Sequence, residues 1–331
     1  MDRIAQLEIW LQQHFPGSSF TLAPASADAS FRRYFRVSFS DRTLVAMDAP
    51  TQHEDCRPFL RVAELFGAAG VHVPEVLAKD LEQGFLLLSD LGGTTYLDAL
   101  SRGGDATALY RDATAALVKI QQASRPGALP EYDEALLRRE LDLFPEWYLG
   151  KHLQTVLSAE QKAALDAVFA AILRNNLAQP QVFVHRDYHS RNLMVTEPNP
   201  GILDFQDAVY GPVTYDLVSL FKDAYVEWTE EQILDWLIRY WEQAKKADLP
   251  VDRDFAQFYR DFEWMGVQRH IKVLGIFARL CYRDGKDGYL KDMPLVMRYL
   301  RKTCRRYGEL HPLLQLLDAL EGSAAQVGYT F

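Results

Sequence analysis

Residues 181–207 place two carboxylates and an amide around one predicted turn. Two apolar runs, 193–196 and 202–205, flank the Pro- and Gly-containing segment 197–201, a pattern typical of a short β-hairpin. Folding the hairpin brings Asn192, at the start of the first strand, opposite Asp204 at the end of the second. Asp187 lies one loop upstream. Hard oxygen ligands of this kind suit Mg²⁺ and, through it, a polyphosphate. Asp187 is then free to act as a base.

These residues also occur in the order of a known catalytic core. His185-Arg186-Asp187 through Asn192, followed by Leu203-Asp204-Phe205, resembles the catalytic loop and metal-binding strand end of protein-kinase-like enzymes. His189 gives the Asp-x-His-x-x-Asn form of the aminoglycoside phosphotransferase family. The resemblance implies ATP and Mg²⁺ as cofactors, Asp187 as catalytic base, Asn192 and Asp204 as catalytic metal ligands, and Asp216 as a brace for the loop. We expect His189 either to brace the loop or to contact phosphate.

Composition and charge restrict the class of partner. The chain has 331 residues and a formal net charge of −9, and it lacks the Lys and Arg clusters that bind nucleic acid. A small-molecule substrate is therefore expected, with no nucleic-acid and no membrane partner. Three widely spaced cysteines predict neither a disulfide framework nor a zinc site, which fits a reducing cytoplasm. The N-terminus reads as an amphipathic helix and not as a signal sequence. We expect a monomer.

Periodicity and composition predict two lobes. Aromatic and β-branched runs at 20–24, 31–39 and 43–47 predict an antiparallel meander, followed by a helix at 54–69 and strands at 76–78 and 85–88. After residue 90 every predicted element except the hairpin is a helix: 105–122, 131–149, 158–177, 229–247, 252–282 and 293–307. This is an α+β pattern. Together with the resemblance it predicts a bilobal protein-kinase-like fold: a nucleotide-binding N-lobe at 1–90, and a C-lobe at 91–331 that carries the catalytic loop and substrate site. The resemblance also implies that the linker residues Ser89, Asp90 and Leu91 offer backbone groups to adenine.

The small lobe departs from the kinase pattern in two places. The segment 26–33, where kinases have a glycine-rich phosphate loop, contains no glycine, and Val45-Ala46-Met47-Asp48 carries an acid where kinases have a lysine. Arg33 alternates with Phe35 and Val37 and is the charged member of an otherwise apolar strand face. Its expected anionic partner is either Asp48 or the nucleotide. We predict that the nucleotide-binding residues in this lobe are Ser30, Arg32, Arg33 and Ala46.

A closer resemblance concerns the acceptor. Residues 29–34, 46–50, 185–192, 204–208 and 211–212 are similar to bacterial anomeric amino-sugar kinases within the family. This similarity implies phosphorylation of the anomeric hydroxyl of N-acetylmuramate or N-acetylglucosamine in peptidoglycan recycling. Glu146 and Trp147 are candidate sugar contacts, although a tryptophan is more often part of the core. Arg269 and Lys272 share one helical face, and either could meet the carboxylate of N-acetylmuramate, although Arg269 could instead pair with an acid of the scaffold.

Two alternatives from other functional classes stay open. An aminoglycoside or choline-like amine-alcohol kinase would need a strongly acidic pocket for its cationic acceptor. A non-catalytic nucleotide-binding module is favoured by the missing lysine and glycine loop, but Asp187, Asn192 and Asp204 argue against it. A peptide kinase is disfavoured, because Gly211 and Asp216 follow Asp204 too closely for a long activation loop.

Overall fold

The computed structural model describes residues 2–26 and 31–326. The chain forms two compact units. The first contains the residues up to 116 together with 191–207, and the second contains 117–190 together with the residues from 208 onward. Strands concentrate in the first unit and helices in the second, so the predicted α+β class is correct.

The first unit is built on a five-stranded antiparallel sheet in the order β1-β2-β3-β5-β4. The predicted meander is confirmed as β1 to β3, and β5 pairs with β3 on one side and β4 on the other. The elements of this unit are α1 (Arg3–His14), β1 (Thr21–Ser26), β2 (Arg33–Ser38), β3 (Thr43–Asp48), α2 (Cys56–Ala68), β4 (Val76–Asp80), β5 (Phe85–Ser89), α3 (Tyr96–Ser101), the first part of α4 (Ala106–Gln122), β7 (Leu193–Met194) and β8 (Gly201–Ile202).

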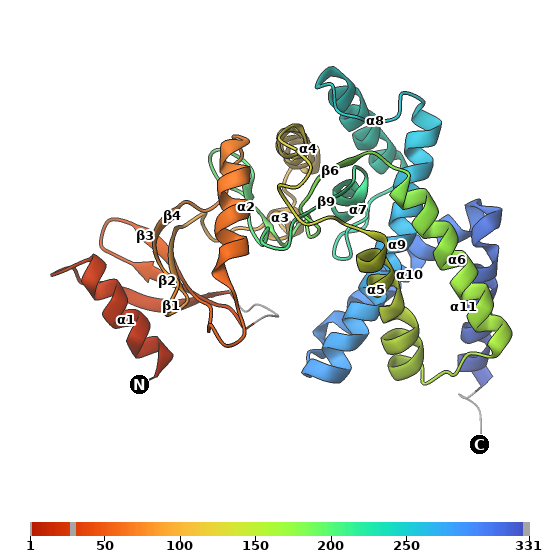
Figure 1. The fold of residues 1–331 in the computed structure, drawn as a ribbon, viewed down its shortest axis with the longest axis horizontal. Helices are drawn as coiled ribbons and strands as arrows, with labels where there is room; N and C mark the ends of the chain where they lie inside the picture. The colour runs from red at the N-terminus through yellow and green to blue at the C-terminus, as the bar shows by residue number, and fades with distance from the viewer. Residues whose placement is uncertain (1, 27–30, 327–331) are drawn as a thin grey trace. The chain divides into compact units, whose positions relative to one another are not determined.

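One face of this sheet is covered by α1, the red helix in Figure 1. The apolar stripe of the helix meets alternate residues of the strands, as the two-residue period of a strand requires. The resulting core contains Leu7, Trp10, Leu11, Phe35, Val37, Leu44, Ala46, Phe85 and Leu87. The predicted N-terminal amphipathic helix is thus a structural part of the sheet unit.

The predicted hairpin forms as β7 and β8, with Leu193 paired to Ile202 and Met194 to Gly201. The strands are shorter than predicted because their backbone groups find partners elsewhere in the same unit. Val195 N donates to Thr94 O at 2.9 Å, and Ile202 N donates to His72 O at 2.8 Å. The hairpin therefore belongs to the compact unit that holds the five-stranded sheet.

The predicted lobe boundary near residue 90 falls just after β5, whereas the two compact units divide within α4. The assignment of nucleotide binding to one lobe and substrate binding to the other stays a prediction.

The second unit is organised around α9 (Phe255–Asp284), which packs against α5, α6, α7 and α10. Two helices begin with capping boxes, at Ser158 with Gln161 and at Thr229 with Gln232. The other elements are α5 (Glu134–Leu143), η1 (Phe144–His152), α6 (Ala159–Leu177), β6 (Gln181–Val184), β9 (Val209–Pro212), α7 (Tyr215–Phe221), α8 (Glu230–Lys246), η2 (Asp287–Asp292), α10 (Met293–Arg306), η3 (Gly308–Leu310) and α11 (His311–Gln326).

The expectation that only the hairpin is non-helical after residue 90 is wrong. Strands β6 and β9 form a further antiparallel pair. In the sequence β6 precedes, and β9 follows, the segment 185–207 that contains the catalytic motif. Their runs, Gln181–Val184 and Val209–Pro212, are too short to show a strand period. Helices α3, α7 and α11 were also not predicted.

The helix predicted over 131–149 is two elements. It begins at Glu134, where Asp133 caps the N-terminus, and it becomes a π-helix at Phe144. Pro145 has no N–H to continue the α-helical ladder. At the same junction α9 lies so close that a Cβ on Gly275 would be 2.6 Å from the Leu143 carbonyl carbon. Proline and this close approach explain the change of helix type.

Within the described ranges, no helix combines the length and apolar character needed to span a bilayer.

Candidate active site

The hairpin brings Asn192 and Asp204 together as predicted. Asn192 Nδ2 donates to Asp204 Oδ2 at 3.3 Å, and Leu203 N donates to Asn192 O at 2.9 Å. Asp204 has φ +61°, a left-handed conformation that is uncommon for a non-glycine residue and is often found at functional sites. Its side chain is 37% exposed. The carboxylate is therefore accessible at a strained backbone position.

The donor atoms of this pair suit a hard cation. Carboxylate and amide oxygens are the ligands that Mg²⁺ prefers, and Mg²⁺ is usually held by one or two carboxylates together with substrate phosphates. Among the residues that the structure describes, no three His, Cys, Asp or Glu side chains gather into a metal cage. Asn192 and Asp204 thus fit a metal whose coordination is completed by a nucleotide.

Two neighbouring arginines of the first unit have different partners. Arg32 lies beside the hairpin, with its guanidinium 3.9 Å from Asp204 Oδ1. Arg33 instead pairs with Asp48, the first of its two expected partners, across the β2–β3 register. Its Nε donates to Asp48 Oδ2 at 3.1 Å, while Arg3 Nε donates to Oδ1 at 3.0 Å. Asp48 is fully buried, so these two arginines supply the positive charge that a buried carboxylate needs.

The other predicted nucleotide contacts are distributed over the same unit. Ser30 lies outside the described residues. Ala46 is fully buried in the core under α1, which does not support a direct ligand contact there. Ser89 accepts from Glu75 N at 2.8 Å, and Asp90 pairs with Arg36 at 2.7 Å. Leu91 is buried.

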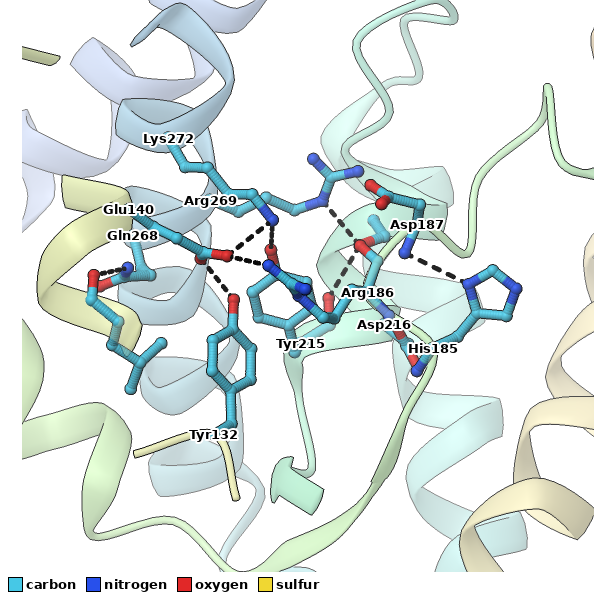
Figure 2. A network of polar contacts seen from close by, with 12 residues as sticks. Tyr132, Glu140, His185, Arg186, Asp187, Tyr215, Asp216, Gln268, Arg269 and Lys272 are labelled. Atoms are coloured by element: carbon cyan, nitrogen blue, oxygen red, sulfur yellow. Dashed lines mark hydrogen bonds and ion pairs between the residues drawn. The ribbon is translucent and has the colours of Figure 1, made fainter. Parts of the chain in front are cut away.

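In the second unit the catalytic loop is held by buried carboxylates on both sides of Asp187. Asp216 Oδ2 accepts from His185 N at 2.7 Å, and its Oδ1 accepts from Arg186 N at 3.0 Å, as the family resemblance implied. Asp223, which is fully buried, accepts from Ser190 N at 3.0 Å. Figure 2 shows Asp216 beneath the loop and Asp187 beside His185. The loop backbone is fixed before and after the candidate base.

Asp187 is a partly buried carboxylate surrounded by cations. Burial alone would raise its pKa, but the positive charges of Lys272, His189, Arg269 and Arg186 outweigh burial and hold the pKa well below its usual range. Asp187 is therefore ionised at any physiological pH, and it is a weak base. The ring of His189 meets Tyr225 edge-on, with centroids 5.6 Å apart, a contact that favours the bracing role. A contact of His189 with phosphate stays a prediction.

Arg269 and Lys272 lie on α9, as Figure 2 shows, and both are buried. Lys272 Nζ donates to Tyr215 OH at 2.9 Å and is 3.1 Å from Glu140 Oε1, whereas Arg269 Nε donates to Ser219 Oγ at 2.6 Å. Lys272 therefore pairs with an acid of the scaffold, whereas Arg269, for which the sequence left that possibility open, donates to a hydroxyl. Contact of either residue with a sugar carboxylate stays a prediction.

Glu140 and Asp223 are the site residues that sequence reasoning missed. Glu140 could have been found, because it interrupts the apolar helical stripe of Leu137, Leu141 and Phe144, the same signal that singled out Arg33. Asp223 has no such signal, since it follows a short helix.

The predicted sugar contacts Glu146, which is exposed, and Trp147, which is half-buried, both lie on the π-helix η1. Their role stays a prediction.

The buried brace Asp216 should make stability depend on pH. Burial raises its pKa to about 7, more than the N–H donors His185 and Arg186 lower it. In the unfolded chain an aspartate titrates at about 3.9. Between these values the folded protein holds a proton that the unfolded chain has lost, so stability falls as pH rises toward 7 and the loss is complete above it.

Asp216→Asn should remove this pH dependence. The side-chain amide of the variant has one hydrogen-bond acceptor fewer than the carboxylate at every pH. This lowers the stability of the variant by an amount that does not depend on pH. We expect the Tm of the variant minus that of the wild type to increase between pH 5 and 8. A difference that stays flat across this range in thermal unfolding would contradict the titration of Asp216.

Comparison with known proteins assigns this geometry to a family. Residues 21–255 match the model of the phosphotransferase enzyme family. A Pseudomonas aeruginosa protein named N-acetylmuramate/N-acetylglucosamine kinase is 52% identical over 332 residues, covering 97% of this chain and 98% of the relative. A Neisseria meningitidis protein of the same name is 51% identical over 336 residues, the full length of both chains.

Solved structures agree on the fold. The crystal structure of a choline/ethanolamine kinase family protein from Mesorhizobium loti aligns with a TM-score of 0.65 at 15% identity, covering 95% of this chain and 98% of that one. The chain therefore belongs to the phosphotransferase enzyme family, and it is an ATP-using kinase of protein-kinase-like fold.

Proposed function

We propose that this enzyme transfers the γ-phosphoryl group of ATP to the anomeric hydroxyl of N-acetylmuramate or N-acetylglucosamine, giving a sugar 1-phosphate for peptidoglycan recycling. The observation that carries this proposal is the similarity, at 51–52% identity over essentially the whole chain, to two kinases named for these amino sugars. The choice of the anomeric hydroxyl rests mostly on the same family resemblance, and the chemistry of the base supports it.

The electrostatics of Asp187 support an acidic hydroxyl as acceptor. In the proposed reaction the sugar oxygen forms a bond to the γ-phosphorus, the bond to the ADP oxygen breaks, and the hydroxyl proton passes to Asp187. Nearby cations lower the pKa of Asp187, so the carboxylate is a poor base for an ordinary alcohol. An anomeric hydroxyl is more acidic than other sugar hydroxyls, and the loose transition state of phosphoryl transfer demands less of the base.

Asn192 and Asp204 are proposed as the ligands of Mg²⁺, with Arg32 beside them as a nucleotide contact. When bound, the metal neutralises charge on the phosphate oxygens. Arg32 replaces the kinase lysine in this scheme, because Arg33 is already paired with Asp48. Ser89 to Leu91 are proposed to meet adenine, with Glu146 and Trp147 as sugar contacts.

The two arginines give a matched pair of variants. Arg32→Ala should weaken ATP binding by about tenfold or more, since a charge-assisted bond to phosphate contributes roughly 1.5 to 3 kcal/mol. Arg33→Ala should instead lower thermal stability and leave ATP affinity nearly unchanged, because it leaves Asp48 with Arg3 alone. Nucleotide titration and thermal unfolding of both variants would distinguish these effects. If Arg33→Ala weakened ATP binding and Arg32→Ala lowered thermal stability, Arg33 and not Arg32 would be the phosphate contact.

A cationic acceptor is the main alternative, because one of the matching crystal structures belongs to the choline/ethanolamine kinase family. At 15% identity that likeness concerns the fold alone. The groups that most strongly affect Asp187 are Lys272, His189, Arg269 and Arg186. Such surroundings repel an amine and favour a neutral or anionic sugar.

The test is a panel of acceptors followed by product identification. ATP consumption is measured with N-acetylmuramate, N-acetylglucosamine, choline and an aminoglycoside, and the product is examined by phosphorus NMR. We expect an anomeric phosphate from both amino sugars. A C6 ester would overturn the anomeric assignment, and consumption of choline or an aminoglycoside alone would overturn the substrate class.

We further propose that the enzyme acts as a monomer in the cytoplasm, where ATP is available. Its formal charge of −9 disfavours a nucleic-acid partner.

A further inference from the structure

The carboxylate of Glu140 contacts residues from three other segments of the chain. It lies on α5, is 6% exposed, and faces Tyr132 from the segment before α5, Arg186 from the catalytic loop and Lys272 from α9. Tyr215 of α7 completes the group through its bond to Lys272. Burial would raise the pKa of Glu140, but the positive charges of Lys272 and Arg186 lower the pKa by more than burial raises it. Glu140 is therefore an anion shared by two cations.

Helices α5 and α9 pack closely enough for Lys272 to reach Glu140. Gly275 follows Lys272 by one turn of α9, and it lies against Leu143, which follows Glu140 by about one turn of α5. Any side chain at Gly275 would separate the helices and lengthen the 3.1 Å contact between Lys272 and Glu140. On the other side Tyr132 is fixed by its backbone bond to Tyr210 and by the close approach of Gly211.

Arg186 connects this cluster to the candidate base, which is the next residue. Its backbone has φ +78° and is held by Asp216, while its side chain is bound by Glu140. A left-handed conformation at a bulky residue persists only where the surroundings hold it. The backbone bond and the side-chain ion pair therefore fix the residue before Asp187 from two directions.

Lys272 connects the cluster to Asp187 by charge. Burial lowers the pKa of Lys272, and the negative charge of Glu140 is the largest influence that raises it. Without Glu140 two buried cations, Lys272 and Arg186, would repel each other, and both would act on Asp187 without compensation. An uncompensated buried charge is costly, and a lysine relieves it by losing its proton.

We propose that Glu140 is a positioning residue for phosphoryl transfer: its carboxylate holds Arg186 and Lys272 in place around Asp187 and offsets their charge. The proposal rests on the function proposed above. It assigns Glu140 no contact with substrate or nucleotide.

Glu140→Gln is the first test, because the amide keeps the size and removes the charge. We expect kcat to fall by about 10- to 100-fold, as for a small displacement of a reacting group, with KM for ATP within about twofold of the wild type. Activity of the variant should also fall as pH rises from 7 to 9, because Lys272 deprotonates. Lysines labelled with ¹³C at Cε report that titration by NMR, without any acceptor.

Matched variants separate charge from packing. Tyr132→Phe removes a bond to Glu140 but not its charge, and Glu134→Gln makes the same change at an exposed position of α5. Both should keep kcat within about threefold of the wild type, whereas Glu140→Asp should recover part of the loss. In a double-mutant cycle, Lys272→Met combined with Glu140→Gln should cost clearly less than the sum of the single effects.

Each other outcome counts against the inference. Near-normal kcat for folded Glu140→Gln would overturn it, and so would a reduced kcat with an unchanged pH profile and an unshifted Lys272 titration, since that describes a purely structural role. If Glu140→Gln does not fold, Glu140→Asp replaces it: because it keeps the charge but shortens the side chain, we expect a smaller fall in kcat with an unshifted Lys272 titration, and a near-normal kcat would overturn the inference. Absence of wild-type turnover on any amino sugar would refute the proposed function instead, and the lysine titration would still test the charge balance.

Discussion

Replacing Asp187 by Asn should lower kcat by about 10² to 10⁴, the range typical of general-base catalysis. The amide has nearly the same shape, so the backbone bonds that Asp216 and Asp223 make to the loop should remain. What is lost is the acceptor of the hydroxyl proton and the negative charge next to Lys272 and Arg269. Affinity for ATP should hardly change, because the proposed nucleotide contacts lie in the other compact unit.

The measurement is steady-state turnover with an amino sugar, together with ATP titration and thermal unfolding. Asp235→Asn is a suitable control, since Asp235 is an exposed aspartate on α8 that pairs with Arg239 of the same helix. It should behave as the wild type. If Asp187→Asn retains most of its turnover, Asp187 is not the base.

Replacing Asp204 by Ala should damage nucleotide binding and chemistry together, with a loss of about 10² to 10³ in kcat/KM. Asp204 provides the carboxylate of the proposed metal site, and it also orders Gln206, whose amide donates to Oδ1 at 2.8 Å. We expect both a higher KM for ATP and a higher Mg²⁺ concentration at half-maximal activity. This combination differs from the effect at Asp187, where binding is preserved.

Activity is measured across a magnesium series at several ATP concentrations. Glu197→Ala, an exposed acid in the turn of the same hairpin, serves as control and should leave both dependences unchanged. An unaltered Mg²⁺ requirement in Asp204→Ala would remove the metal role from this residue.

The hairpin and its pair of ligands could be predicted because the information is local. Apolar runs around a Pro- and Gly-containing turn determine the pairing, and the pairing determines that Asn192 meets Asp204. The sheet and most helices were predictable for the same reason. A helix or strand that buries one face shows its period in the sequence.

The missed features depend on contacts between distant segments. Glu140 acquires its partners from a loop and from α9, and Asp48 acquires Arg3 from the N-terminal helix. Nothing near these acids in the sequence specifies those cations. The π-helix at Phe144 likewise depends on Gly275 of a distant helix as well as on the adjacent Pro145.

The ion pair between Arg186 and Glu140 bears on how such an enzyme is controlled. Protein kinases often order their activation segment only when a phosphate is added and an arginine binds it, which makes the modification an on-switch. Here the anion that receives the arginine is encoded in the chain, and it is buried beneath the loop from the moment of folding. Arg186 therefore needs no added phosphate to be held in place. Control of this kind would leave the output in the cell to follow the supply of sugar and the amount of protein made, as expected of a salvage step.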